Sequence, residues 1–128
     1  MPNDNLVVIA AMARKGGSGK TTLSRALISA AVAAGRRVLL IDTDSTGVLG
    51  AWHERAEAAG LGSPLLRSIS VESVGAVDRK IEQVYDADSA DFVFIDTAGV
   101  GAEWSDGIAV LVDHIVTPVM LSTSDLDV

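Results

Sequence analysis

A lysine and a threonine that suit phosphate and magnesium binding stand together near the N-terminus. Lys20 and Thr21 come directly after a glycine-rich stretch that contains Gly16, Gly17 and Gly19. Glycine lets a backbone wrap closely around a phosphate because it carries no Cβ, and the N–H groups of such a loop form an anion-binding concavity. The lysine then reaches the terminal phosphates, and the threonine hydroxyl ligates Mg²⁺. The stretch therefore predicts a nucleoside triphosphate site.

The elements around this loop are those that a phosphate site needs. An apolar run over residues 6–13 predicts a buried strand before the loop, and apolar residues at helical spacing predict a helix over 20–34 after it. The N-terminus of that helix adds the positive end of its dipole. The alternative is a glycine-rich turn without a ligand, but such a turn would not require Lys20 and Thr21 at the helix start.

Carboxylates follow two further apolar runs. Asp96 comes directly after the predicted strand 92–95, and Asp42 and Asp44 follow the predicted strand 38–41. A carboxylate at the end of a strand beside a phosphate-binding loop can hold Mg²⁺ directly or through a water. The alternative for Asp96 is an acidic loop cap, and the alternative for Asp44 is a solvated carboxylate.

The loop sequence Lys-Gly-Gly-x-Gly-Lys-Thr, residues 15–21, resembles the deviant Walker A loop of the ParA/MinD family of ATPases. Arg14 replaces the first glycine of the usual pattern. In that family the first lysine reaches across a dimer interface to the partner's nucleotide, so the resemblance implies that Lys15 acts in trans and Lys20 in cis. The alternative for Lys15 is a solvated loop lysine.

The same resemblance implies roles for the acidic residues. Asp44 would orient the attacking water, Asp42 would support the magnesium shell, and Asp96 would be the Walker B carboxylate. Members of the family usually continue Asp-x-Asp with Pro-Gln-Gly, whereas this chain has Ser45-Thr46-Gly47, so we expect a more mobile switch loop. The segment that ends in Gly99 also resembles the D-x-x-G switch of related GTPases, in which a glycine N–H reads the γ-phosphate.

The predicted site therefore has three overlapping sets of residues, with ATP and Mg²⁺ as cofactors. The catalytic set is Lys15, Lys20 and Asp44. The metal-ligating set is Thr21, Asp42 and Asp96. The nucleotide-binding set is Lys15, Gly16, Gly17, Ser18, Gly19, Lys20, Thr21, Thr22 and Gly99.

Strands and helices alternate along the chain. Further helices are predicted over 47–59, 73–86 and 104–111, and further strands over 65–71 and 114–120, the first of them near a sheet edge because its polarity is mixed. This alternation predicts an α/β fold of the P-loop NTPase type, a mostly parallel sheet with helices on both faces. Right-handed crossovers bring the strand C-termini to one edge, where ligands bind. We expect residues 1–128 to form one P-loop ATPase domain that is C-terminally incomplete, since ParA-type proteins continue beyond this point.

Composition limits the possible partners. The chain has no cysteine, which excludes disulfides, thiol catalysis and iron–sulfur clusters. Its net charge of −7 provides no overall basic surface for nucleic acid, so DNA binding is expected only of a longer form. No apolar run approaches the roughly 20 residues of a membrane helix, and we expect a cytoplasmic protein with no membrane partner.

Several other residues receive only modest functional interpretations. His53 is expected to be solvated in the middle of a helix, and His114 has no partner pattern for metal or triad chemistry. Trp52 and Trp104 are interpreted as core or interface aromatics, with a nucleotide-dependent dimer surface as the alternative for Trp104. No base adjoins Ser18, Ser45 or Ser105, so a nucleophilic serine is not supported.

The predicted function is that of a ParA-like ATPase that hydrolyses ATP slowly. Its nucleotide-dependent homodimerisation would drive DNA partitioning or cargo positioning, and the resemblance implies a ParB-like stimulator. One alternative is a GTPase related to signal-recognition particle proteins, although no lysine follows Lys80 to form the usual guanine-selecting segment. The other is a non-enzymatic interaction fragment of a P-loop protein.

Overall fold

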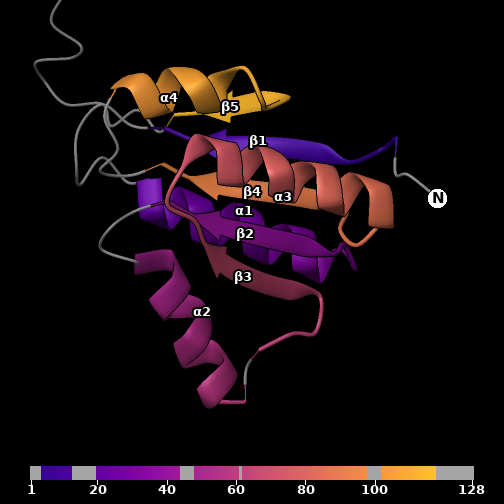
Figure 1. The fold of residues 1–128 in the computed structure, drawn as a ribbon. Coiled ribbons are helices and arrows are strands. Elements are labelled where there is room, and N and C mark those ends of the chain that lie inside the picture. The colour runs from indigo at the N-terminus through magenta and orange to yellow at the C-terminus, as the bar shows by residue number, and fades with distance from the viewer. Residues whose placement is uncertain (1–3, 13–19, 44–47, 61, 98–101, 118–128) are drawn as a thin grey trace, which may run out of the picture.

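Five parallel strands form the centre of the computed structural model, which describes residues 4–12, 20–43, 48–60, 62–97 and 102–117 (Figure 1). The strand order is β3-β2-β4-β1-β5, and every paired neighbour is parallel. Helices connect the strands in the alternating order that the sequence predicts. The elements are β1 Val7–Ala11, α1 Lys20–Ala33, β2 Val38–Asp42, α2 Val48–Ala58, β3 Leu66–Ser70, α3 Val74–Ala87, β4 Phe92–Asp96, α4 Ala102–Ala109 and β5 His114–Val116.

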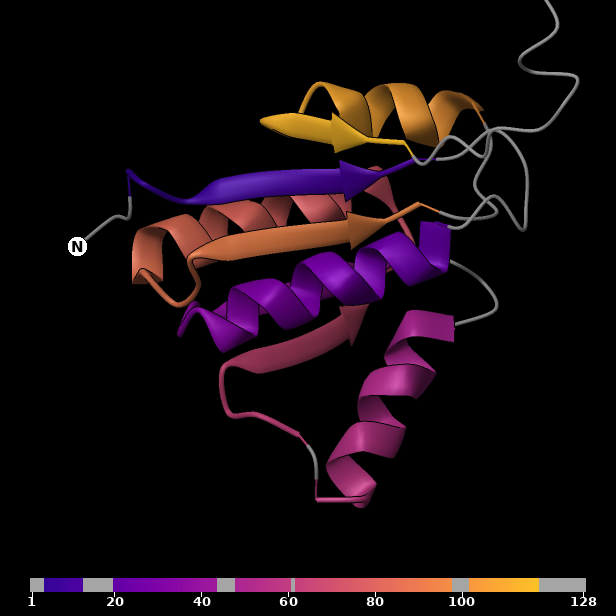
Figure 2. The same ribbon diagram turned by 180° about the vertical axis from the view of Figure 1, so that it is seen from behind.

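Helices cover both faces of this sheet, as predicted. Side chains alternate along each strand, and the two sets of strand residues build two separate hydrophobic clusters. On one face, strand residues such as Leu39 and Ile95 pack with Val77 of α3 and Ile108 of α4. On the other face, strand residues such as Leu40 pack with Ile28 of α1 and Leu49 of α2. The two views from opposite sides show these layers (Figures 1 and 2).

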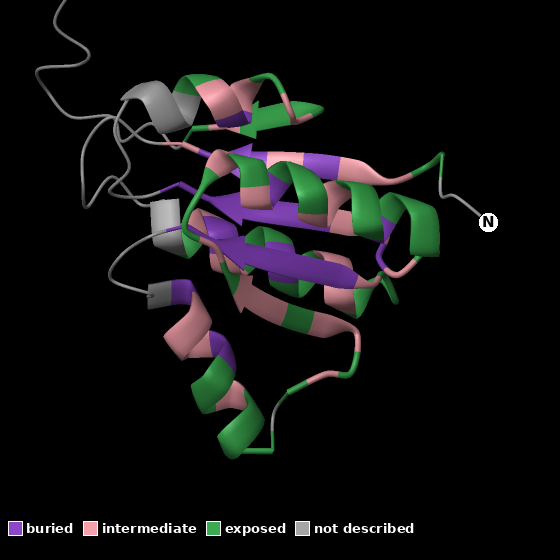
Figure 3. Cartoon of the chain, viewed as in Figure 1, coloured by how far each residue is buried: buried purple, intermediate pink, exposed green. Residues whose placement is uncertain are grey.

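Burial is deepest in the strands that have neighbours on both sides. Every residue of β2 is buried, and so are four of the five residues of β4 (Figure 3). Apolar residues cover both faces of such strands, which explains their continuous apolar runs. The outer strand β3 has no fully buried residue, which confirms its predicted position at a sheet edge.

Local signals set the helix ends. Gly35 has a positive φ of 79°, and the N–H groups of Gly35 and Arg36 donate to the carbonyls of Val32 and Ala31, a Schellman-type end for α1. The sequence predicts this stop at Gly35. At the start of α3, the Ser73 hydroxyl accepts from the Ala76 N–H at 3.1 Å, as an N-cap residue does.

Some predicted boundaries differ from those observed. Helix α4 begins at Ala102 and ends at Ala109, whereas the sequence predicts 104–111. Strand β5 ends at Val116, and the predicted strand continues into residues 118–120, which lie outside the described ranges. Helix and strand ends commonly differ by a few residues because terminal hydrogen bonds are weak. None of the described helices is long and apolar enough to cross a membrane.

An arginine clasp joins the N-terminal ends of two strands, at the edge of the sheet away from the predicted site. Arg37, just before β2, donates from its side chain to both carboxylate oxygens of Asp91, at 3.3 and 3.0 Å, and to Asp88 at 2.8 Å. The Arg37 backbone N–H also donates to Asp91 at 2.8 Å. These hydrogen bonds lower the pKa of the Asp91 carboxyl below its ordinary value.

Candidate nucleotide-binding site

The two strand-end carboxylates that the sequence predicts as metal ligands lie side by side. Asp42 and Asp96 are register partners across β2 and β4, and Asp96 is in turn the partner of Ala11 at the end of β1. Only 2% of Asp42 and 1% of Asp96 is exposed. The prediction that strand C-termini bring these residues to one edge is therefore confirmed for this pair.

Both carboxylates belong to the face of the sheet that α1 and α2 cover. Along β2 and β4, Asp42 and Asp96 follow Leu40 and Phe94 by two residues, and those two residues pack in the cluster beneath α1 and α2. Residues two apart on a strand share a face. Helix α1 begins at Lys20 near the same ends of the strands (Figure 2). The two acids thus stand on the side where the lysine- and threonine-bearing helix starts.

The two threonines that follow these acids, Thr43 and Thr97, continue the hydrogen bonding of the sheet. No role is predicted for them from the sequence. The Thr97 hydroxyl donates to the Ala11 carbonyl at 2.7 Å, and the Thr43 hydroxyl donates to the Asp96 carbonyl. Their backbone N–H groups donate to the same carbonyls, at 3.3 and 3.1 Å. These bonds hold the C-terminal ends of β1, β4 and β2 together. The repeated tripeptide Ile-Asp-Thr, at 41–43 and 95–97, was the signal that could have revealed them.

Asp42 also takes part in the fold of the next helix. One of its carboxylate oxygens accepts from the Gly50 N–H, in the first turn of α2, at 3.2 Å. A Cβ on Gly50 would lie 3.2 Å from that oxygen, so a glycine leaves room for the contact. Negative charge is favourable at a helix N-terminus. Asp42 therefore has a structural role at the start of α2, and its role in a magnesium shell stays a prediction.

Of the remaining predicted site residues, the structure describes some and not others. Lys20, Thr21 and Thr22 are the first three residues of α1, and Thr22 is exposed. The other predicted residues lie outside the described ranges, so their roles stay predictions: Lys15, Gly16, Gly17, Ser18, Gly19, Asp44 and Gly99.

The donor set suits magnesium held together with phosphates. Mg²⁺ in nucleotide sites uses one or two carboxylates plus substrate phosphates, whereas other metals take several protein ligands. Asp42 and Asp96 provide two neighbouring carboxylates, and the part of the chain that the structure describes contains no cluster of three or more His, Cys, Asp or Glu ligands. The residues present therefore fit Mg²⁺ bound with a nucleotide.

The prediction of a solvated His53 is wrong. His53 is only 8% exposed, its Nδ1 lies 2.6 Å from the Ser68 hydroxyl, and its Nε2 lies 3.1 Å from a Glu57 carboxylate oxygen. This side of α2 meets the edge strand β3, so a helix face that is polar in sequence is covered. His53 therefore fastens α2 to β3.

Of the other residues considered from sequence, Trp52 packs against the hydrophobic cluster beneath α1 and α2, as predicted for a core aromatic. The Arg25 guanidinium lies over its ring, 5.8 Å from the centroid, in a cation–π contact. His114 is exposed on β5.

Almost the whole chain matches one known protein family. The family described as VirC1 protein matches residues 5–128. The protein virC1 of Rhizobium radiobacter and that of Rhizobium rhizogenes are each 29% identical to this chain over 113 residues. Those matches cover 88% of this chain and 48% of each relative, so the chain spans about half the length of these relatives.

Solved structures share the fold. A chain of the MinC:MinD cell division protein complex from Aquifex aeolicus matches with a TM-score of 0.64 and 20% identity, over 87% of this chain and 55% of that one. FlhF complexed with GTP and Mg²⁺ matches with a TM-score of 0.55 and 17% identity, over 94% of this chain and 48% of that one. The prediction of a ParA/MinD-type P-loop NTPase fold is confirmed.

Proposed function

The chain belongs to the VirC1 protein family, and on that premise we propose that it is the nucleotide-binding part of a ParA-like ATPase. It binds ATP with Mg²⁺ and hydrolyses it slowly. The outcome of the cycle is a change of association between two copies of the protein, which serves DNA partitioning or cargo positioning. One fold relative was solved in a cell division protein complex and the other with GTP and Mg²⁺, and both agree with a nucleotide-dependent assembly role.

One observation carries this proposal: the buried, register-paired carboxylates Asp42 and Asp96 lie on the face where α1 begins with Lys20 and Thr21. Two adjacent carboxylates beside the start of α1 offer the oxygen ligands that Mg²⁺ uses together with substrate phosphates. Bound Mg²⁺ supplies neutralisation of the phosphate oxygens.

The chain's own residues would divide the work as follows. Thr21 and Asp96 hold the metal, and Asp42 supports its shell while it keeps α2 in place. Lys20 pairs with the terminal phosphates of its own nucleotide, and Lys15 with those of the partner subunit. Asp44 orients the attacking water, since phosphoryl transfer depends mainly on positioning and charge. A ParB-like protein is the expected stimulator.

Calorimetry with MgATP, MgADP and MgGTP tests nucleotide binding. We expect Lys20→Ala to weaken MgATP binding at least about tenfold, because a charge-assisted contact with phosphate is lost. Lys80→Ala, which removes the same charge from helix α3, is the matched control and should bind as the unchanged chain does.

Sedimentation with and without MgATP tests association. Lys15→Ala should keep nucleotide binding and lose ATP-dependent dimerisation. If Lys15→Ala still dimerises with ATP, the proposed role of Lys15 at the partner subunit's nucleotide is wrong. Tighter binding of MgGTP than of MgATP would favour the GTPase alternative, and no binding of either would favour a non-enzymatic interaction fragment.

A further inference from the structure

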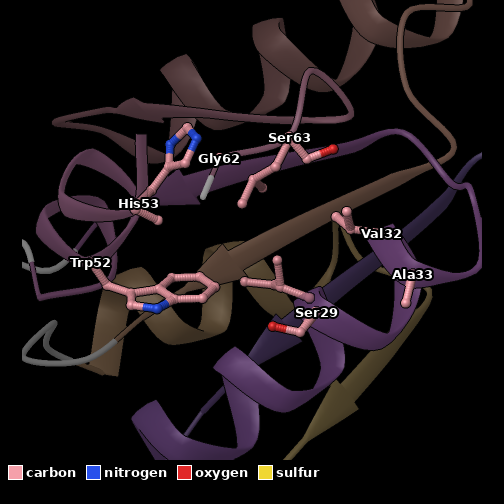
Figure 4. Close-up of a pocket in the computed structure, with 10 residues that line it drawn as sticks. Ser29, Val32, Ala33, Trp52, His53, Gly62 and Ser63 are labelled. Atoms are coloured by element: carbon pink, nitrogen blue, oxygen red, sulfur yellow. The ribbon is translucent and has the colours of Figure 1, made fainter. Parts of the chain in front are cut away.

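A hollow of about 230 Å³ opens between α1, α2 and the edge strand β3, apart from the nucleotide site. Its apolar walls come from Ile28 and Val32 of α1, Trp52 and Ala56 of α2, and Leu66 of β3. In the close-up, the indole of Trp52 points from α2 toward α1 across this space (Figure 4). Residues of three elements, distant in sequence, therefore enclose one apolar depression.

The size of the hollow suits a single side chain. Pockets for cofactors and drug-sized ligands usually measure roughly 300–1,000 Å³, so 230 Å³ is small for a whole metabolite. The volume is adequate for one aromatic ring or one leucine-sized group. The small and exposed residue Ala33 lies at its border, so a main chain can approach closely there.

A positive charge lies against Trp52, one of the residues that line the hollow. Arg25 lies on α1 one helical turn before the lining residues Ile28 and Ser29, and its guanidinium covers the Trp52 ring. Among the residues that the structure describes, Arg25 has no hydrogen bond or ion pair, and its buried Nε has no acceptor. A carboxylate placed beside this guanidinium would meet a charge that the described chain does not neutralise.

A negative charge lies against Gly62, another residue that lines the hollow. Glu57 is on the last turn of α2, and its carboxylate lies beside the lining residue Gly62, within 3.0 Å of the point where a Cβ would be. The Glu57 side chain is 53% exposed, and its Oε1 lies 3.1 Å from His53 Nε2. Both helices run away from the C-terminal edge of the sheet (Figure 2). Arg25 lies in the second turn of α1, and Glu57 lies in the last turn of α2.

We propose that this hollow is a docking site for a short segment of a partner protein. One large apolar side chain of the phenylalanine or leucine type fills the hollow, an acidic residue of the segment meets Arg25, and a basic residue meets Glu57. Charge complementarity selects the segment and orients it, while apolar burial supplies the affinity. This site goes beyond the proposed ATPase function and does not depend on it.

The test uses blocked heptapeptides with a central phenylalanine and alanine spacers. One peptide carries a glutamate and a lysine at its two ends, a second carries lysine at both ends, and a third has alanine in place of phenylalanine. Binding is followed by the fluorescence of Trp52 in a Trp104→Phe background. We expect the glutamate–lysine peptide to bind at least about tenfold more tightly than the other two.

Two variants identify the site. Ala33→Leu fills the hollow from an exposed position of α1 and should weaken the favoured peptide at least about tenfold. Ala30→Leu makes the same change at an exposed position of α1 that does not line the hollow, and should leave affinity unchanged. In Arg25→Glu both charges beside the hollow become negative, so preference should switch to the peptide with two lysines.

Three outcomes would overturn the proposal. The first is the absence of binding by any of the peptides at millimolar concentration. The second is a failure of either variant to change binding: Ala33→Leu does not weaken the favoured peptide, or Arg25→Glu does not switch the preference. This outcome counts when the circular dichroism and the thermal midpoint of the variant match those of the parent. The third is equal affinity for phenylacetate, which would assign the hollow to a small aromatic carboxylate.

Discussion

At the scale of single residues, Asp42 combines an observed contact with α2 and a proposed role in the magnesium shell. It is a buried strand-end acid next to Asp96, and it accepts the Gly50 N–H at the start of α2. If Asp42 belongs to the proposed magnesium shell, a change in that shell would act directly on the position of α2. The two contributions differ in chemistry, because the hydrogen bond needs an oxygen acceptor and the metal shell needs negative charge.

Substitution of Asp42 separates them. Asp42→Asn retains an oxygen that can accept from Gly50, whereas Asp42→Ala removes it and should lower the free energy of unfolding by about 1 kcal/mol more than the Asn variant does. Both variants should weaken Mg²⁺-dependent nucleotide binding. Urea denaturation measures the first effect and calorimetry the second. Equal stability of the two variants would show that the bond to Gly50 contributes nothing.

At the scale of elements, close packing of α3 against α4 depends on one glycine. A Cβ on Gly107 of α4 would lie 3.1 and 3.2 Å from the two γ-carbons of Val74 in α3, tighter than ordinary contact. Alanine is favoured over glycine within a helix by roughly 1 kcal/mol. The packing and the helix propensity therefore oppose each other at this position.

A double-mutant cycle isolates the packing term. Gly107→Ala should raise the free energy of unfolding by about 1 kcal/mol in a Val74→Ala background and by clearly less in the parent, where the valine crowds the new methyl. Gly75→Ala, at an exposed position of α3 with only ordinary contacts, is the control and should stabilise the parent. An equal gain in both backgrounds would exclude the predicted contact. Denaturant midpoints supply the measurement.

Helix α2 is held by contacts with both β3 and α1. His53 links α2 to β3 through Ser68, and Arg25 of α1 covers Trp52 of α2. These contacts hold α2 against β3 and α1, and the hollow remains between the three elements. Helix α2 thus connects the strand-end acid Asp42 with the proposed docking site.

At the scale of the whole molecule, the two ends of the sheet carry different groups of charged residues. The C-terminal edge carries the acids, and the N-terminal edge is tied by the clasp of Arg37 with Asp88 and Asp91. The guanidinium holds the pKa of Asp91 below its ordinary range, mainly through side-chain hydrogen bonds. The charge-assisted bonds between Arg37 and Asp91 therefore contribute fully to stability only while Asp91 is ionised.

This linkage predicts an acid-dependent loss of stability. Because the pKa of Asp91 is lower in the folded than in the unfolded chain, its contribution is complete above the unfolded value of about 3.9 and disappears as pH falls through the folded value. Asp91→Asn should therefore flatten the fall in unfolding free energy below about pH 4, since that residue no longer titrates. Asp78→Asn, at an exposed position of α3, is the control. Parallel pH curves for Asp91→Asn and the parent would contradict the linkage.

The sequence by itself determined the order of strands and helices, the parallel α/β class, the stop of α1 at Gly35, the edge character of β3 and the strand-end positions of Asp42 and Asp96. These features follow from local patterns, namely apolar runs, helical spacing and turn residues, which need no knowledge of distant contacts. Only the tertiary structure decided that β4 lies between β1 and β2, which makes Asp96 the direct neighbour of Asp42. It also decided that His53 is buried against Ser68 and that a hollow separates α1 from α2. Strand order and helix tilt depend on pairing and packing between segments far apart in the chain, and no local pattern records them.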